Sequence, residues 1–326
     1  MLAGAAPVVA ALPMAGLAAV PAIGGAATSA RSAPPPAGHD HAAMIGEGVP
    51  APGGPHDLDA LLVPPPALPH SPGRVRRYEV AAIDREVEVA PGVLFPAWTY
   101  NGTVPGPVIR ATQDDILEVE FSNAGSHPHT IHFHGIHPAN MDGVFEIVNP
   151  GESFTYRFPA TPWGMQLYHC HASPLKKHIH KGLYGAFIID PPEPRPPATE
   201  LVMVMNGFDT DGDGENNFYT VNGKAFYYAK YPIRVRRSET VRIYLANLTE
   251  FDLINTFHLH ANFFDYYDPG TRLEPTLRQV DTIMQAQGQR GILEFSYKDY
   301  EPGLYMFHAH VSEFAELGWM GVFDVH

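Results

Sequence analysis

Apolar and polar residues alternate in two stretches of this chain that resemble one another. Residues 115–123 read Asp-Ile-Leu-Glu-Val-Glu-Phe-Ser-Asn, and residues 239–247 read Glu-Thr-Val-Arg-Ile-Tyr-Leu-Ala-Asn. A period of two is typical of a strand with one buried face. A second matching pair of segments, 163–169 and 302–308, leads in each case to a histidine. The pattern therefore predicts two copies of one β-strand unit.

Each copy is predicted to be an antiparallel β-sandwich, because short alternating strands and frequent turn residues are present and a long helical period is missing. The chain has 30 glycines and 33 prolines, which supply turns. The proline-rich run 191–197 joins the copies. We expect an all-β protein with two domains, residues 76–192 and 198–326.

The first 75 residues have a different composition. Residues 1–30 are rich in Ala, Gly and Val and end in small residues, which is typical of an export signal, although no Lys or Arg precedes the apolar stretch. Prolines 7, 13 and 21 disfavour a membrane-spanning helix there. Residues 31–75 contain two runs of three prolines and are predicted to be a disordered, extended linker. We therefore expect an exported protein, extracellular or periplasmic.

Four histidine pairs, each with one intervening residue, carry the chemistry. They are residues 132 and 134, 169 and 171, 258 and 260, and 308 and 310. Alternate side chains of a strand point to the same face, so each pair directs two imidazoles to one place. Cys170 is the only cysteine and stands inside the second pair, where its thiol faces the other way. The spacing predicts a metal cage of eight imidazoles with a thiol one peptide unit away.

Composition narrows the function classes. One cysteine in 326 residues cannot form an intrachain disulfide, so the thiol is either buried and inert or a metal ligand. The formal net charge of −14 and the pI of about 5.6 argue against nucleic acid or an anionic membrane as a partner.

From about Tyr100 to the C-terminus, these pairs and their flanking residues resemble the multicopper oxidase family. The resemblance implies two Greek-key cupredoxin domains and four copper ions per chain. In that family a type 1 copper takes electrons from a reductant, and a trinuclear cluster on eight histidines reduces dioxygen to water.

The resemblance also implies where the type 1 copper binds. His129, Cys170 and His178 match the family's ligands, and Leu183 falls on the axial position. A leucine cannot donate to the metal as a methionine thioether does, so a raised reduction potential is expected.

Two alternatives to the type 1 histidines remain open. The loop between His171 and His178 is longer than the spacer usual in laccases and is similar to that of copper nitrite reductases. His127 and His180 each lie two residues from a favoured ligand and would share its face on a regular strand.

The second copy lacks the corresponding ligands. Asn255 replaces the first histidine, Ala309 replaces the cysteine, and Phe314 and Trp319 fall where the other histidine and the axial residue would be. We therefore expect no type 1 site in the second domain.

The other copper ligands are carried over in the same way. His132 and His258 resemble the type 2 ligands, and the type 3 pair takes the remaining cage residues His134, His169, His171, His260, His308 and His310. Asp142 resembles the acid that relays protons beside the cluster. A turn carboxylate is the alternative for Asp142, because Asp-Gly is a common turn dipeptide.

Residues 209–215 hold a second candidate metal site. Three aspartates at alternate positions resemble the start of a calcium loop, but Thr220 stands at the twelfth position, where a bidentate Glu is expected. A solvated turn is the alternative interpretation.

These features favour a laccase-like oxidase that takes electrons from phenols or aromatic amines and passes them to dioxygen. One alternative is a copper nitrite reductase, which needs only a three-histidine mononuclear site. Two further alternatives are a cuprous-ion oxidase and a copper-binding protein without catalysis. The sequence has no methionine-rich segment that would capture Cu(I), which argues against the cuprous-ion oxidase.

The number of domains predicts an assembly. Each domain carries only two of the four pairs, and the short connector limits how the two domains of one chain can face each other. Two-domain relatives close a ring in which domain one of each subunit meets domain two of the next. We expect a homotrimer with the trinuclear sites between subunits.

Overall fold

The structure, a computed structural model, describes Leu58 and residues 60–326. The predicted export signal and most of the predicted linker lie outside the described residues, so both stay predictions. Within the described part, no helix is long and apolar enough to cross a membrane. Strands make up most of the regular secondary structure of the described residues and the helices are short, as the all-β prediction requires.

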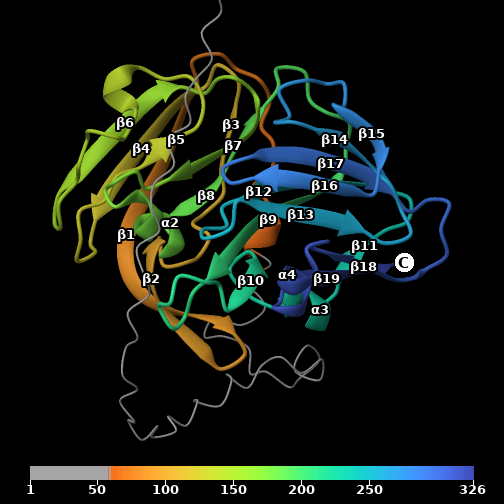
Figure 1. Cartoon of the computed structure of the whole chain (residues 1–326). Coiled ribbons are helices and arrows are strands. Elements are labelled where there is room, and N and C mark those ends of the chain that lie inside the picture. The colour runs from red at the N-terminus through yellow and green to blue at the C-terminus, as the bar shows by residue number, and fades with distance from the viewer. Residues whose placement is uncertain (1–57, 59) are drawn as a thin grey trace, which may run out of the picture. The chain divides into compact units, whose positions relative to one another are not determined.

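The first domain is a sandwich of two four-stranded sheets (Figure 1). One sheet has the order β2-β1-β4-β6, with the bounds Val93–Tyr100, Val75–Ala90, Ile116–Asn123 and Ser153–Pro159. The other has the order β3-β8-β7-β5, with the bounds Ile109–Thr112, Tyr184–Asp190, Gly164–His169 and His132–Phe133. Two short helical segments interrupt the loops, η2 (Ala139–Met141) and α2 (Leu175–His180).

The second domain has larger sheets. One follows the order β10-β9-β12-β17-β14-β15, with the bounds Phe218–Val221, Thr199–Phe208, Thr240–Asn247, Arg290–Ser296, Phe264–Tyr267 and Leu277–Val280. The other follows β11-β19-β18-β13-β16, with the bounds Ile233–Val235, Met320–Val325, Gly303–His308, Ile254–Leu259 and Thr282–Ala286. The helices are α3 (Tyr227–Lys230) and α4 (Ser312–Glu316).

The antiparallel prediction is wrong for four strand pairs. β1 runs parallel to β4 and β3 to β8 in the first domain, while β9 runs parallel to β12 and β11 to β19 in the second. Greek-key connections bring together strands that are not hairpin neighbours, and such strands can run in the same direction. The same positions are parallel in both domains, which supports the two-copy interpretation.

The two stretches of alternating residues differ in burial. In β4, Leu117, Val119 and Phe121 are fully buried while Glu120 between them is exposed, as expected for a half-buried strand. In β12, by contrast, every residue after the first is buried. The second face of β12 packs against the first domain, so a pattern that predicts a solvated face there is overridden by the domain contact.

An apolar core shared by the two domains explains this burial. Tyr244 and Ala246 of β12 pack in one cluster with Met165 and Leu167 of β7 and Ile188 of β8. Because burial of apolar surface stabilises a contact by about 25 cal/mol per Å², this cluster holds the domains of one chain together.

A buried ion network lies at the edge of that core. Arg110 is 4% exposed, and its guanidinium donates to Asp190 at 2.8 Å and, across the domain boundary, to Glu200 at 2.7 Å. Arg242 of the second domain also donates to Glu200, at 3.0 Å. Each of these charges has a partner, as buried charges require.

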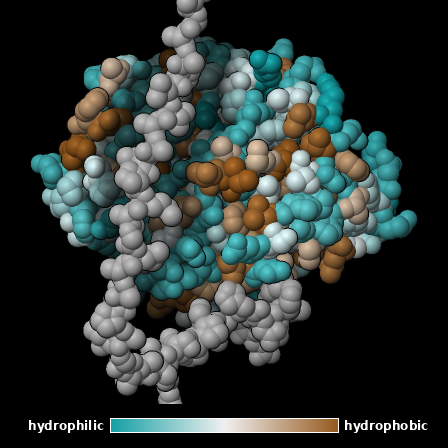
Figure 2. Space-filling model, viewed as in Figure 1, coloured by the Kyte–Doolittle hydropathy of each residue, from teal (hydrophilic) through white to brown (hydrophobic). Residues whose placement is uncertain are grey.

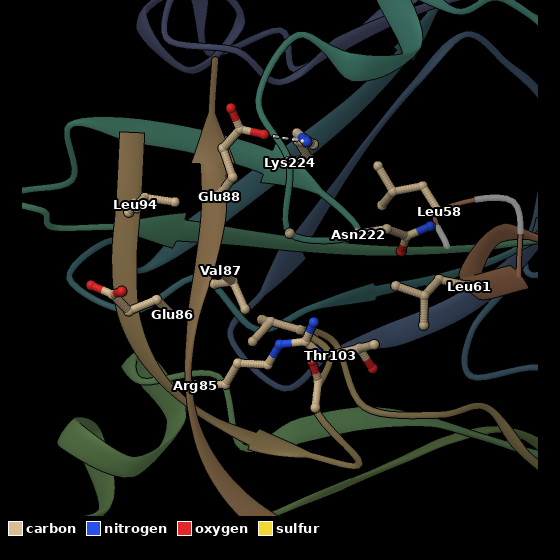
Figure 3. A pocket seen from close by; sticks show the side chains of 13 residues that line it. Leu58, Leu61, Arg85, Glu86, Val87, Glu88, Leu94, Thr103, Asn222 and Lys224 are labelled. Carbon is tan, nitrogen blue, oxygen red and sulfur yellow. Dashed lines mark hydrogen bonds and ion pairs between the residues drawn. The ribbon is translucent and has the colours of Figure 1, made fainter. Parts of the chain in front are cut away.

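The described end of the predicted linker is packed, which the sequence interpretation did not anticipate. Leu58, Leu61 and Leu62 belong to the core cluster of the second domain, although they precede the first domain in the chain. Figure 3 shows Leu58 and Leu61 beside a small cavity that the β1–β2 hairpin borders, where Glu88 binds Lys224 at 2.8 Å. This segment therefore contributes contacts to both domains.

Candidate metal centres

Three ligand-type side chains converge in the first domain. The Cys170 Sγ lies 3.2 Å from the His178 Nδ1 and 4.0 Å from the His129 Nδ1, and the two Nδ1 atoms are 3.2 Å apart. Cys170 follows β7, His178 lies on α2, and His129 lies in the segment before β5. The three residues are 0 to 3% exposed. The structure thus brings together the three predicted type 1 ligands in one buried cluster.

Burial controls the protonation of this cluster. Desolvation lowers the pKa of both His129 and His178 to about 4, so their imidazoles are neutral at pH 7. Desolvation also raises the pKa of the Cys170 thiol. Neutral imidazoles offer lone pairs, and a bound cation would favour the thiolate. One thiolate and two imidazoles, sealed from water, are a donor set that fits type 1 copper.

Leu183 lies next to the cluster. It is fully buried in the same apolar core as Cys170, and its carbonyl oxygen accepts the Cys170 N–H at 2.9 Å. Its own N–H donates to the His178 carbonyl oxygen at 3.2 Å. The backbone therefore ties the predicted axial residue to two of the three predicted ligands.

The alternative ligands lie outside the cluster. His178 and His180 are on α2 rather than on a strand, and residues two apart on an α-helix point about 200° away from each other. The His180 Nε2 accepts the Asp209 N–H at 3.0 Å. The exposed His127 packs on Trp98, with 4.4 Å between ring centroids.

Four histidines of the first domain form a second cluster. Ring centroids of neighbouring members lie 5.2 to 5.8 Å apart, and the Nε2 atoms of His134 and His169 face each other at 3.2 Å. Mainly through desolvation, the pKa of His134 is lowered to about 3 and that of His169 to about 4. Two neutral imidazoles whose Nε2 atoms face each other fit a shared metal site, because a neutral imidazole can present its lone pair at Nε2. The set, called here the first half-site, consists of His132, His134, His169 and His171.

The second domain repeats this arrangement. Neighbouring ring centroids are 4.9 to 6.0 Å apart, and the Nε2 atoms of His260 and His308 face each other at 2.8 Å. The cross-strand pairs also match, since His132 is opposite His169 and His258 is opposite His308. The set, called here the second half-site, consists of His258, His260, His308 and His310.

Matching hydrogen bonds orient the rings of both half-sites. The Nδ1 of His132 bonds to the carbonyl oxygen of Asp142 at 2.7 Å, and the Nδ1 of His258 to that of Asp281 at 3.0 Å. A carbonyl oxygen can only accept, so each Nδ1 carries the proton and each Nε2 keeps its lone pair. Such a hydrogen bond fixes the tautomer that binds a metal.

Two further pairs of contacts repeat between the domains. The Nδ1 of His169 bonds to the Cys170 carbonyl oxygen at 3.0 Å, and that of His308 to the Ala309 carbonyl oxygen at 2.6 Å. The N–H of the last histidine in each half-site donates to a threonine Oγ1 at 2.9 or 2.8 Å, in the pairs His171–Thr130 and His310–Thr256.

The structure does not join the two half-sites within one chain. Among the described residues, no ring contact and no group of ligand atoms combines histidines from both sets. The second half-site is open to solvent, since His260 and His310 are exposed. Large apolar side chains are also exposed in both domains: Phe145 at 84% in the loop between η2 and β6, Leu253 at 87% just before β13, and Leu304 at 70% on β18. Figure 2 shows apolar side chains gathered on the visible face near β12 and β13.

Asp142 lies beside the first half-site with a neighbour that the sequence did not reveal. Its Oδ1 is 3.3 Å from the His132 Nδ1 and 3.7 Å from the Nε2 of His137. The side chain of His137 is 8% exposed. No spacing rule singles out a histidine in this turn, so only the fold reveals the contact. Asp142 also ends η2, so its turn role and its place beside the cage are both present.

The second domain has no equivalent of the cluster of His129, Cys170 and His178. Asn255 donates to the Thr249 Oγ1 at 3.0 Å, Ala309 is buried, and Trp319 is fully buried in the domain core. Phe314 stacks on Tyr219 with 3.8 Å between ring centroids. Apolar packing therefore fills the space where a type 1 site would lie.

The aspartates of residues 209–215 lie close together, with ligand atoms of Asp209, Asp211 and Asp213 within 4.8 Å of one another. The carboxylate of Asp209 accepts N–H groups of Gly212 at 2.6 Å and Gly214 at 2.9 Å. These two hydrogen bonds are sufficient to hold the turn, so its conformation does not require a bound calcium ion.

Comparison with known families assigns the chain. Two family models, both described as multicopper oxidase, match residues 83–194 and 194–326. The chain belongs to the multicopper oxidase family.

Individual relatives include both oxidases and reductases. A solved structure described as a multicopper oxidase is 53% identical, has a TM-score of 0.77 and matches over 82% of this chain and 96% of that chain. A copper-containing nitrite reductase from Neisseria meningitidis is 30% identical over 280 residues, 78% of this chain and 71% of that protein. The solved copper nitrite reductase from Nitrosomonas europaea is 25% identical, with a TM-score of 0.71 over 78% of this chain and 94% of that one. The family is thus a family of copper oxidoreductases, and copper is the metal that the chain's donor sets fit.

Proposed function

We propose that this protein is a laccase-like oxidase that couples one-electron oxidation of phenols or aromatic amines to the reduction of dioxygen to water. The proposal rests mainly on the complete set of eight cage histidines, whose Nδ1 hydrogen bonds and facing Nε2 atoms repeat between the domains. A three-histidine mononuclear site would leave most of this arrangement without a use.

Each ligand-type residue then has one task. His129, Cys170 and His178 hold the type 1 copper, and His132 and His258 hold the type 2 copper. The other six cage histidines hold the type 3 pair. Copper supplies one-electron redox chemistry at these sites. The peptide bonds that link Cys170 to His169 and His171 give electrons a short covalent path between the two kinds of site.

The assembled protein is proposed to be a homotrimer with cages between subunits. Each half-site supplies four of the eight histidines, and the two sets are not joined within the described chain. The exposed side chains of Phe145, Leu253 and Leu304 favour burial against a second copy. A heterologous contact of this kind closes into a ring, which completes one cage at each interface.

A copper nitrite reductase is the second candidate, because curated relatives with that name match 78% of the chain. Oxygen uptake separates the two candidates. With a phenolic donor we expect dioxygen consumption without release of peroxide, together with copper at about four ions per chain and a blue absorption band. Nitrite reduction with negligible oxygen uptake would make the reductase the correct assignment.

Asp142→Asn tests the proton relay. The amide keeps the shape of the side chain but cannot exchange a proton, so reoxidation of the reduced protein by dioxygen should slow by about 10²-fold. Reduction of the blue centre by the donor consumes no proton at this site and should keep its rate. Stopped-flow absorbance measures both steps separately. Equal slowing of the two steps would indicate a structural role for Asp142 in its turn.

Leu183→Met tests the axial position. A thioether stabilises the oxidised copper, and a tenfold preference for that form lowers a one-electron potential by about 59 mV. We expect a decrease of this order in a redox titration followed at the blue band. Leu167→Met, at another fully buried leucine of the same domain, is the control and should leave the potential unchanged. An unchanged potential in Leu183→Met would place the axial position elsewhere.

A further inference from the structure

A group of lysines surrounds the predicted type 1 ligand His178. Only six lysines occur in the whole sequence, and three of them, Lys176, Lys177 and Lys181, fall within six residues around this histidine. They lie on α2 and at its C-cap. The chain as a whole has a net charge of −14, so this segment is a local exception.

Each of these ammonium groups lies over an aromatic ring. The Nζ of Lys176 is 3.9 Å from the ring centroid of Phe251, and that of Lys177 is 5.2 Å from the centroid of Trp98. The Nζ of Lys181 is 4.5 Å from the centroid of Phe95. A cation over a ring face is attracted by the ring quadrupole. The rings therefore restrain the lysines, and Lys176 and Lys177 remain exposed to solvent.

Aromatic contacts connect this surface to the buried cluster. Trp98 lies 5.3 Å from His129 and 4.8 Å from His178, measured between ring centroids, and 4.4 Å from His127. His129 and His178 are 0% and 3% exposed, Trp98 is 7% exposed, and His127 is exposed. A donor in solvent can therefore contact His127 and the small exposed part of Trp98 more readily than the cluster itself.

Carboxylates near this surface are engaged or buried. The Asp84 carboxylate accepts the hydroxyl and the N–H of Ser126, and Asp209 accepts two backbone N–H groups. Glu250 is 7% exposed. Asp211 and Asp213 are exposed in the loop after β9, where their carboxylates accept the Asn217 side-chain amide and the Glu215 N–H. Lys177 is the lysine whose ammonium group lies over Trp98, and Trp98 in turn contacts His129 and His178. Of the three lysine charges, that of Lys177 therefore lies next to the ring that contacts the buried ligand cluster.

We infer that Trp98, His127 and Lys177 form a docking site for aromatic electron donors that carry a carboxylate. The donor ring would pack on the exposed His127 ring, which lies on Trp98, and its carboxylate would face the Lys177 ammonium. The oxidation itself rests on the proposed function: one electron leaves the phenol for the copper held by the buried cluster, and the phenolic proton goes to water.

Two phenols with the same ring test the charge preference. Syringate carries a carboxylate, whereas 2,6-dimethoxyphenol does not. In Lys177→Gln we expect kcat/KM for syringate to fall about fourfold at low ionic strength, since one charge at about 5 Å in water contributes this much. The value for 2,6-dimethoxyphenol should change less than about twofold, and about 0.5 M salt should remove the difference. For each phenol, the kcat/KM of the variant is divided by that of the wild type with the same phenol. The difference in reduction potential between the two phenols therefore does not affect the comparison.

Lys298→Gln is the matched control, because Lys298 is exposed in the second domain and outside the lysine group. It should change neither value. Equal losses for both phenols in Lys177→Gln, or the same syringate loss in Lys298→Gln, would overturn the docking site.

A binding measurement keeps this inference separate from the oxidase proposal. 3,4,5-Trimethoxybenzoate has no phenolic hydrogen to lose, and its affinity can be measured by calorimetry without turnover. Wild type should bind it about fourfold more tightly than Lys177→Gln at low ionic strength. Equal affinity, or no binding to wild type, overturns the docking site. If neither phenol is oxidised but this difference is found, the oxidase proposal fails and the docking site stands.

Discussion

Cys170→Ser should abolish both the blue absorption and the oxidation of donors, while most of the remaining copper stays bound. The thiolate gives the type 1 centre its colour, and a serine hydroxyl is a hard, poor ligand for copper. In the structure the Cys170 Sγ contacts only the cluster of His129 and His178, at 4.0 and 3.2 Å, among the predicted copper ligands. The cage histidines keep their own hydrogen bonds, so the change should cost about one copper ion per chain.

Absorption spectra, copper content and oxygen uptake measure this result. Ala309→Ser is the matched control, because Ala309 occupies the equivalent buried position in the second domain. The control should keep its blue band and its activity. A blue band that survives Cys170→Ser would refute the assignment of the thiol.

Two inactive variants should restore activity to each other when their subunits are mixed. His132→Ala damages the first half-site, and His308→Ala damages the second. If each cage forms between domain one of one subunit and domain two of the next, about one interface in four in a random mixture joins two intact halves. We expect recovery of oxygen uptake after dissociation and reassembly, to about a quarter of the wild-type value.

A second mixture sharpens this experiment. His132→Ala combined with His134→Ala damages the first half-site in every subunit, so no interface is intact and activity should stay absent. Native mass spectrometry of the mixtures verifies subunit exchange and trimer formation. Variants that exchange subunits as trimers but never recover activity would show that the cage lies within one chain.

The sequence by itself predicted the repeated architecture and the grouping of the ligands. Alternation in residues 115–123 and 239–247 identified equivalent strands, because a strand's period is visible in a single segment. The four histidine pairs sit where strands end, and β5 with β7 and β13 with β18 bring them opposite one another. The sequence also predicted that the second domain lacks a type 1 site, since Asn255 and Ala309 cannot replace an imidazole and a thiol as copper ligands.

Local secondary structure separates the favoured ligand from its alternative in space. A strand would have placed His178 and His180 on one face, but the segment folds as α2 and turns them apart. Six helical residues between a cis-proline turn and β8 have too little periodicity to be recognised in sequence. Only the tertiary structure shows that His178 lies beside Cys170 and His180 beside the Asp209 N–H, an arrangement that favours His178 as the ligand.

Contacts between distant segments decided the rest. Only the tertiary structure shows that β12 is buried on both faces, that Leu58, Leu61 and Leu62 pack into the second domain, and that His137 lies beside Asp142. The residue pattern of one helix or strand describes that element alone. It therefore predicts which of its faces is apolar and which of its side chains can bind a metal. It carries no information on which other element covers that face, because packing joins residues far apart in the chain, and those contacts form only when the whole domain pair folds.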